Sequence, residues 1–133
     1  MIADDLKEPS YQCVTFLHAK QAALIDEGLE QTGLHVVTVE ASSMLSHDEL
    51  LATLGRAFAF PDYYGHNYNA LDECLRDLSW LPAPGYVLRV PDAERLWHEA
   101  PQVGGALVNS WLFCAMEWAA QDTPVPFHLL FLW

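Results

Sequence analysis

The segment Phe60-Pro-Asp-Tyr-Tyr-Gly-His-Asn-Tyr-Asn-Ala-Leu-Asp-Glu-Cys-Leu75 joins a loop rich in tyrosine to an amphipathic helix. Asn67 is a good helix-capping residue, and we expect the helix to run over residues 68–78. At 100° per residue, the apolar side chains of this stretch fall on one side and the polar ones on the other. The pattern predicts a surface helix whose outward face carries Asn69, Asp72, Glu73, Arg76 and Asp77.

The loop before this helix has the composition of a protein-binding segment. Tyr63 and Tyr64 cannot both be buried in so short a loop, so we expect at least one to be partly exposed. Rigid, amphipathic tyrosines beside a negative helix face are typical of protein interfaces. Gly65 is expected to take a positive φ that a side chain would resist. Ala70 and Leu71 are expected to let the helix start pack closely on the body of the protein.

On both sides of this segment, predicted strands alternate with predicted helices, which indicates an α/β domain with a mostly parallel sheet. The final helix is nearly all apolar around a narrow polar stripe, so we expect most of it to be buried. Residues 1–10 are expected to form a mobile tail. The strands are predicted at 12–17, 34–40, 86–90 and 127–133, and the other helices at 19–31, behind the Ser46 cap, at 92–100 and at 102–121.

The composition limits the classes of partner. The chain of 133 residues has room for one domain, predicted over 11–133, and its formal net charge is -12. So acidic a chain is not expected to bind nucleic acid phosphates or anionic membranes, but it can attract a basic protein. Its three cysteines suit a reducing compartment, and we see neither a secretory signal nor a membrane span. We therefore expect a cytoplasmic protein.

The tyrosine loop and its helix resemble the hallmark of the barstar family of ribonuclease inhibitors, Pro-x-Tyr-Tyr-Gly-x-Asn-x-x-Ala-Leu. The resemblance covers about residues 34–133 and implies a barstar-like α/β fold, a small, mostly parallel sheet packed with helices. Residues 11–33 would then be an added N-terminal strand and helix. The matching positions are Pro61, Tyr63, Tyr64, Gly65, Asn67, Ala70 and Leu71.

The resemblance implies an inhibitor that inserts its loop and acidic helix into the active site of a small basic ribonuclease. Glu73 matches the main phosphate-mimicking acid of the family, and Tyr63 matches a tyrosine that packs on the enzyme. Asn69 stands where the best-studied inhibitors have an aspartate, and Asp72 replaces a frequent aromatic residue. For the acid that the family supplies from a later helix, Glu117 is the candidate.

We therefore expect partner binding to centre on Tyr63, Asn69 and Glu73. Three other readings stay open: a merely solvated helix face, a binding module for a basic partner that is not a ribonuclease, and a small hydrolase with an unrecognised site. The residues expected around the centre are Tyr64, His66, Asp72, Arg76, Asp77 and Glu117.

Nothing in the sequence has the spacing of a catalytic or metal site. The six histidines show no His-x-x-x-His pattern, and the cysteines show no Cys-x-x-Cys pattern. Gly104-Gly105 lacks the Lys-Ser/Thr that follows a phosphate loop. We expect no enzymatic activity, no metal and no cofactor. The three cysteines, Cys13, Cys74 and Cys114, are expected to pack in the interior.

Overall fold

The computed structural model describes residues 2–9 and 13–133, and its centre is one parallel sheet with the strand order β1-β4-β3-β2. Each of its four strands lies within a segment that the sequence predicts as a strand, which confirms the α/β class. Gln12, the predicted start of the first strand, lies outside the described residues. The strands are β1 (Val14–Leu17), β2 (His35–Thr38), β3 (Tyr86–Val90) and β4 (Phe127–Leu132).

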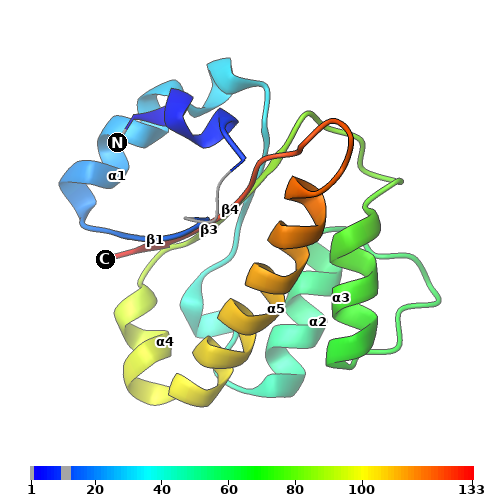
Figure 1. Cartoon of the computed structure of the whole chain (residues 1–133). Coiled ribbons are helices and arrows are strands. Elements are labelled where there is room, and N and C mark those ends of the chain that lie inside the picture. Colours follow the sequence, from blue (N-terminus) through cyan, green and yellow to red (C-terminus); the bar gives the residue numbers. More distant parts are fainter. Residues whose placement is uncertain (1, 10–12) are drawn as a thin grey trace.

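Helices cover both faces of the sheet. Figure 1 shows α1 and the N-terminal 3-10 helix on one side, with α2, α3, α4 and α5 on the other. Within the described part of the chain, no helix is both long and apolar enough to cross a membrane. The bounds are η1 (Ala3–Lys7), α1 (Ala19–Leu29), η2 (Glu30–Thr32), η3 (Ala41–Ser43), α2 (His47–Ala57), α3 (Tyr68–Asp77), α4 (Ala93–Glu99) and α5 (Pro101–Ala119).

Local sequence signals set several of these boundaries. The Ser46 hydroxyl accepts a hydrogen bond from the Glu49 backbone N–H at 3.1 Å and so caps the start of α2. Gly33 follows η2 with φ 75°, a left-handed conformation that glycine adopts without a side-chain clash. Pro101 occupies the first turn of α5, where its missing N–H costs no hydrogen bond.

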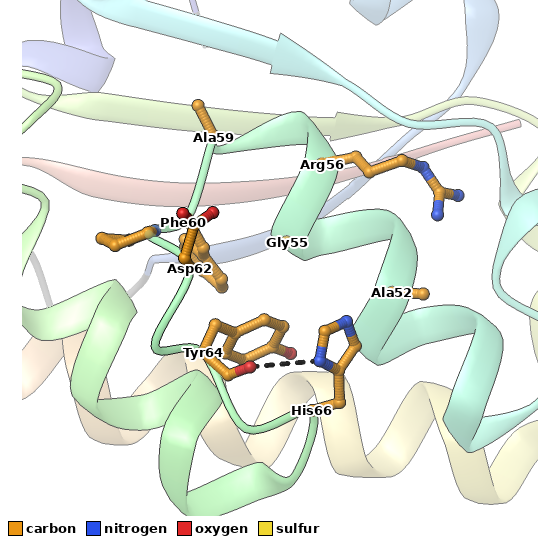
Figure 2. A pocket seen from close by; sticks show the side chains of 9 residues that line it. Ala52, Gly55, Arg56, Ala59, Phe60, Asp62, Tyr64 and His66 are labelled. Carbon is orange, nitrogen blue, oxygen red and sulfur yellow. Dashed lines mark hydrogen bonds between the residues drawn. The ribbon is translucent and has the colours of Figure 1, made fainter.

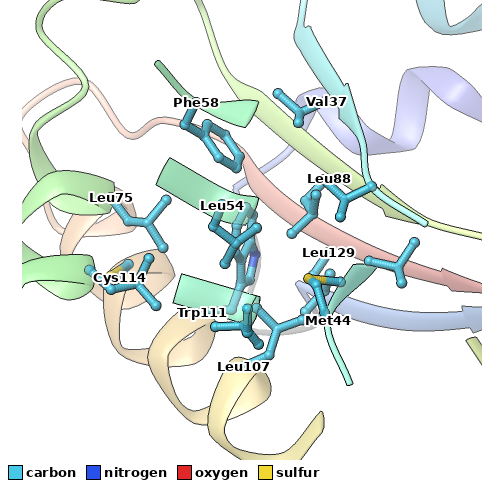
Figure 3. Packing of buried hydrophobic residues seen from close by; sticks show 14 of the residues in the cluster. Val37, Met44, Leu54, Phe58, Leu75, Leu88, Leu107, Trp111, Cys114 and Leu129 are labelled. Atoms are coloured by element: carbon cyan, nitrogen blue, oxygen red, sulfur yellow. The ribbon is translucent and has the colours of Figure 1, made fainter. Parts of the chain in front are cut away.

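The main core lies between the sheet and helices α2–α5. Trp111 of α5 is fully buried, stacks on Phe127 with ring centroids 4.0 Å apart, and donates its indole N–H to the Phe127 carbonyl at 3.2 Å. Figure 3 shows Leu54 of α2, Leu75 of α3 and Leu129 of β4 around the same cluster. This core holds α3 firmly on the body of the protein, because its apolar side is part of it.

A second, smaller core covers the opposite face of the sheet. Leu6 of η1 and Leu130 of β4 are almost completely buried in it, together with Ile25 of α1. The N-terminus therefore differs from the mobile tail expected over residues 1–10, of which the structure describes 2–9. The reason is tertiary packing: Ala3 and Leu6 are three residues apart, so they lie on one side of the 3-10 helix and are both buried in the second core.

The outer face of α5 also differs from the expectation that most of this helix is buried. Leu112, Phe113 and Met116 are exposed, at 38%, 43% and 59%. A helix that packs on one side only must leave its other side in solvent, whatever residues that side carries.

Between the sheet and η1 lies a buried histidine. His128 of β4 is 2% exposed, its Nε2 hydrogen-bonds the Glu8 carbonyl at 3.1 Å, and its Nδ1 is buried without a partner among the described residues. Burial lowers the pKa of His128, because a charged imidazole would lose its hydration there.

Leu6→Ala is expected to lower the free energy of unfolding by about 2–5 kcal/mol, because it leaves a cavity in the second core. Ile2→Ala, at a side chain 57% exposed in the same segment, is the matched control and should change it little. Denaturant unfolding of both variants measures the difference. Equal effects of the two substitutions would show that η1 does not pack on the sheet in solution.

The buried His128 is expected to make the protein less stable in acid. Its pKa is lowered in the folded state, so the unfolded chain takes up the proton first as the pH falls below about 6.5. The free energy of unfolding should therefore fall between about pH 7.5 and pH 5.5, and His128→Leu should flatten that slope. His98→Gln, at an exposed histidine of α4, should leave it unchanged. The measurement is denaturant unfolding at both pH values, and a wild-type slope retained in His128→Leu contradicts this account.

Candidate functional site

Tyr64 anchors the tyrosine loop to α2. Its side chain is 7% exposed, and its hydroxyl donates to the Leu51 carbonyl at 2.9 Å. Its ring lies so close to Gly55 that a Cβ there would come within 2.8 Å of it. Burial raises the pKa of the Tyr64 phenol to about 12, so the hydroxyl stays protonated and keeps donating. Of the two tyrosines, this one holds the loop and leaves little surface for a partner.

The turn after Tyr64 is made differently from the sequence expectation. The left-handed residue is His66, with φ 52°, and Gly65 does not take the positive φ that we predicted. His66 Nδ1 lies 3.2 Å from the Tyr64 carbonyl oxygen, and the two rings lie 4.6 Å apart. The lack of a side chain at Gly65 instead leaves space for the Asn67 side chain, because a Cβ at position 65 would lie 3.3 Å from the Asn67 side-chain nitrogen.

A hollow of about 370 Å³ opens between α2 and this loop. Figure 2 shows the Tyr64 ring next to α2, the His66 ring beside it and Asp62 on the loop side. The Arg56 guanidinium points away from the loop and donates to the Thr53 hydroxyl at 3.3 Å. The acidic and basic side chains that line the hollow are Asp62 and His66 on the loop side and Arg56 on α2.

Asn67 starts α3 as the sequence predicts. Its side-chain oxygen accepts from the Ala70 backbone N–H at 2.8 Å, and Leu71 is fully buried one residue later. The Tyr68 hydroxyl hydrogen-bonds His47 Nδ1 at 2.5 Å and so links the starts of α3 and α2. With Tyr64 and Asn67, this contact fixes the loop and the helix relative to α2.

The outer side of α3 is an acidic face. Asn69, Glu73 and Asp77 are exposed along it, and Tyr63 of the loop is 69% exposed. Partial desolvation raises the pKa of the Tyr63 phenol, and the nearby Cys74 thiol, Asp77 and Glu73 raise it further. The predicted centre therefore has Tyr63 beside two carboxylates of α3.

Arg76 leaves the carboxylates of this face unpaired. Its Nε donates to the Asp72 backbone carbonyl at 3.2 Å, and its guanidinium lies over the Phe113 ring of α5, 5.2 Å from the centroid. Among the described residues, the ion pairs are Asp4–Lys7, Asp26–Arg89 and Arg95–Glu99, all away from α3. The negative charge of the face is thus available to an incoming cation.

The acidic face meets α5 along one side. The Trp118 indole donates to the Leu75 carbonyl at 2.8 Å, and the Cys114 thiol lies 3.6 Å from the Asp72 carbonyl oxygen. Burial raises the pKa of the Cys114 thiol to about 12; Asp72 and Glu117 raise it too, while Arg76 lowers it. Glu117 is exposed on α5, three residues after Cys114, which contacts the Asp72 carbonyl of α3.

Sequence reasoning missed the contribution of Phe113 to this corner. An apolar residue in a nearly all-apolar helix gives no local sign that it faces a neighbouring arginine, so the contact follows only from how α5 packs on α3. Asp72 has a second feature that the sequence does not reveal: its Oδ1 is buried without a hydrogen-bond partner among the described residues.

Tyr64→Phe is expected to lower the free energy of unfolding by about 1–3 kcal/mol, because the Leu51 carbonyl loses its buried donor. Tyr63→Phe removes the same atom from an exposed ring and is the matched control, expected to change stability little. Denaturant unfolding distinguishes the two. An unchanged Tyr64→Phe would mean that the loop is not held on α2 by this hydrogen bond.

Comparison with known families identifies this arrangement of loop, acidic helix and sheet. The family model described as Barstar (barnase inhibitor) matches residues 34–131, which run from just before β2 through most of β4. Comparison with curated proteins gives no match. The matched family is an inhibitor family rather than a catalytic one, and β1 and α1 lie outside the matched range. The chain belongs to the barstar family.

Proposed function

We propose that the protein is a stoichiometric inhibitor of a small basic ribonuclease. The observation that carries this proposal is the row of unpaired carboxylates on α3 beside the exposed Tyr63. A ribonuclease binds a polyanion, so its active site offers cations to the same kind of surface. Family membership supports the choice of a ribonuclease over other basic proteins.

In the proposed complex, the Glu73 carboxylate takes the position of an RNA phosphate among the cationic groups of the enzyme. The exposed Tyr63 ring packs beside it and excludes water, which strengthens the charge interactions. Because Tyr64, Asn67 and the core already hold the loop and α3, little conformational freedom is lost on binding. Inhibition then follows from occupation of the site, and no chemical step is needed.

The other residues of the proposed site differ in what they can offer. Asn69 and Asp77 are exposed and can contact the partner directly, whereas Tyr64 acts by holding the loop. Asp72 is half-buried beside α5 and its Oδ1 is buried, so it offers a partner less of its carboxylate than the exposed Glu73 and Asp77 do. Arg76, His66 and Glu117 lie at the edges, where they affect the range of partners more than the affinity.

A second candidate function is the recognition of a basic protein that is not a ribonuclease. Two departures from the family pattern favour it. Asn69 stands where the family has an aspartate, and Asp72 stands where it frequently has an aromatic residue. Asn69 is neutral and can donate as well as accept hydrogen bonds, so the contact there differs from that of a carboxylate. Asn69→Asp separates the two candidates, because it should tighten binding to the usual ribonuclease of the family.

The protein is expected to abolish RNA cleavage by barnase at an equimolar ratio. Glu73→Gln keeps the shape of the side chain and removes its charge, and we expect it to weaken binding by about 2–5 kcal/mol, because it leaves enzyme cations unpaired. Glu27→Gln, at an exposed acid of α1 on the other side of the sheet, is the matched control and should bind as the wild type does. Affinity is measured by titration calorimetry, and inhibition by RNA cleavage.

Ribonuclease A is a second control, because it is basic but belongs to another family. Equal binding to both enzymes would indicate a general attraction between opposite charges rather than a specific inhibitor. Binding to neither enzyme would count against inhibition and favour the second candidate function.

A further inference from the structure

The outer face of α5 carries an exposed apolar strip formed by Leu112, Phe113 and Met116. Positions 112 and 116 are one helical turn apart, and 113 and 116 are three residues apart, so the three side chains are neighbours on the helix surface. Exposed apolar residues scattered singly need no explanation, whereas contiguous ones are typical of an interaction surface.

The strip is continuous with the acidic face of α3. Phe113 lies under the Arg76 guanidinium, and Cys114, the next residue, contacts the Asp72 carbonyl oxygen. Arg76 therefore joins the acidic face to Phe113, and Met116 lies three residues further along α5.

The charge distribution also assigns the strip to a basic partner. Residues 100–116 contain no acid and no base, and the exposed Glu117 follows directly, three residues after Cys114, which contacts α3. The surface thus offers carboxylates on one side and an uncharged apolar area on the other, which complements a cationic cleft with an apolar border.

We propose that Leu112, Phe113 and Met116 extend the binding face, and that an apolar border beside the cationic cleft of the basic partner covers them. The inference rests on the proposed function and adds to it the second half of the interface. Apolar contact of this kind is not screened by salt, in contrast to the attraction between Glu73 and the partner's cations. The two halves of the interface can therefore be measured separately.

The test uses barnase as the partner and compares affinities at about 50 mM and about 500 mM salt. The double variant Leu112→Ser/Met116→Ser should weaken binding about tenfold or more at both salt concentrations, because the lost contact is apolar. Glu73→Gln should show a loss that shrinks at the higher concentration. Leu24→Ser is the matched control: Leu24 is 58% exposed on α1, against 59% for Met116, and its replacement should leave affinity unchanged.

Met116→Leu should bind as the wild type does, because it keeps an apolar side chain of similar volume, and thermal unfolding checks that each variant is folded. If wild type and double variant bind equally well while Glu73→Gln binds weakly, the strip lies outside the interface and only this inference fails. If the wild type does not bind barnase, the proposed function fails and the inference falls with it. A loss in the double variant that disappears at high salt also overturns the inference, because the contact is then not apolar.

Discussion

The hydrogen bond from the buried Tyr64 hydroxyl to the Leu51 carbonyl is the constraint on which the proposed binding face depends. It fixes the loop on α2, and the Asn67 cap then sets where α3 begins. After the buried Tyr64, the chain turns within two residues toward the start of α3. The left-handed backbone at His66 makes that turn. The neighbouring Tyr63 is left to project beside Glu73 and Asp77. An exposed ring on a firmly held loop favours protein recognition, because little conformational freedom is lost on binding.

The same face carries a cost in stability. Glu73 and Asp77 are like charges one turn apart on α3, and such pairs destabilise a helix slightly. Arg76 could offset them, but its guanidinium lies over Phe113 of α5 instead. The helix is kept in place by its buried side, where Leu71 and Leu75 enter the main core. The fold thus separates the two tasks: apolar packing supplies stability, while the outward charges stay available for a partner.

Much of this fold could be predicted because its signals are local. Alternating strands and helices, the Ser46 and Asn67 caps and the stop at Gly33 each depend on a few neighbouring residues, and the structure has elements at the predicted places. The errors concern contacts between distant segments. Tertiary packing decides whether η1 packs on the sheet and which side of α5 meets solvent. It also decides which residue takes the left-handed conformation after Tyr64. For the proposed site, the sequence could predict an exposed loop tyrosine and the outward position of Glu73, but not the position of Arg76 over Phe113.

The place of β1 in the sheet has a consequence for how the chain folds during synthesis. Val14 pairs with Leu129, so a strand near the start of the described chain has its neighbour near the end. During synthesis β1 and the apolar side of α1 therefore stay without their sheet partner until β4 has left the ribosome. Pairing between such distant segments is intrinsically slow, and uncovered strand edges favour aggregation. The segment outside the matched family range thus waits longest for its sheet partner, and during that time chaperones can act on it.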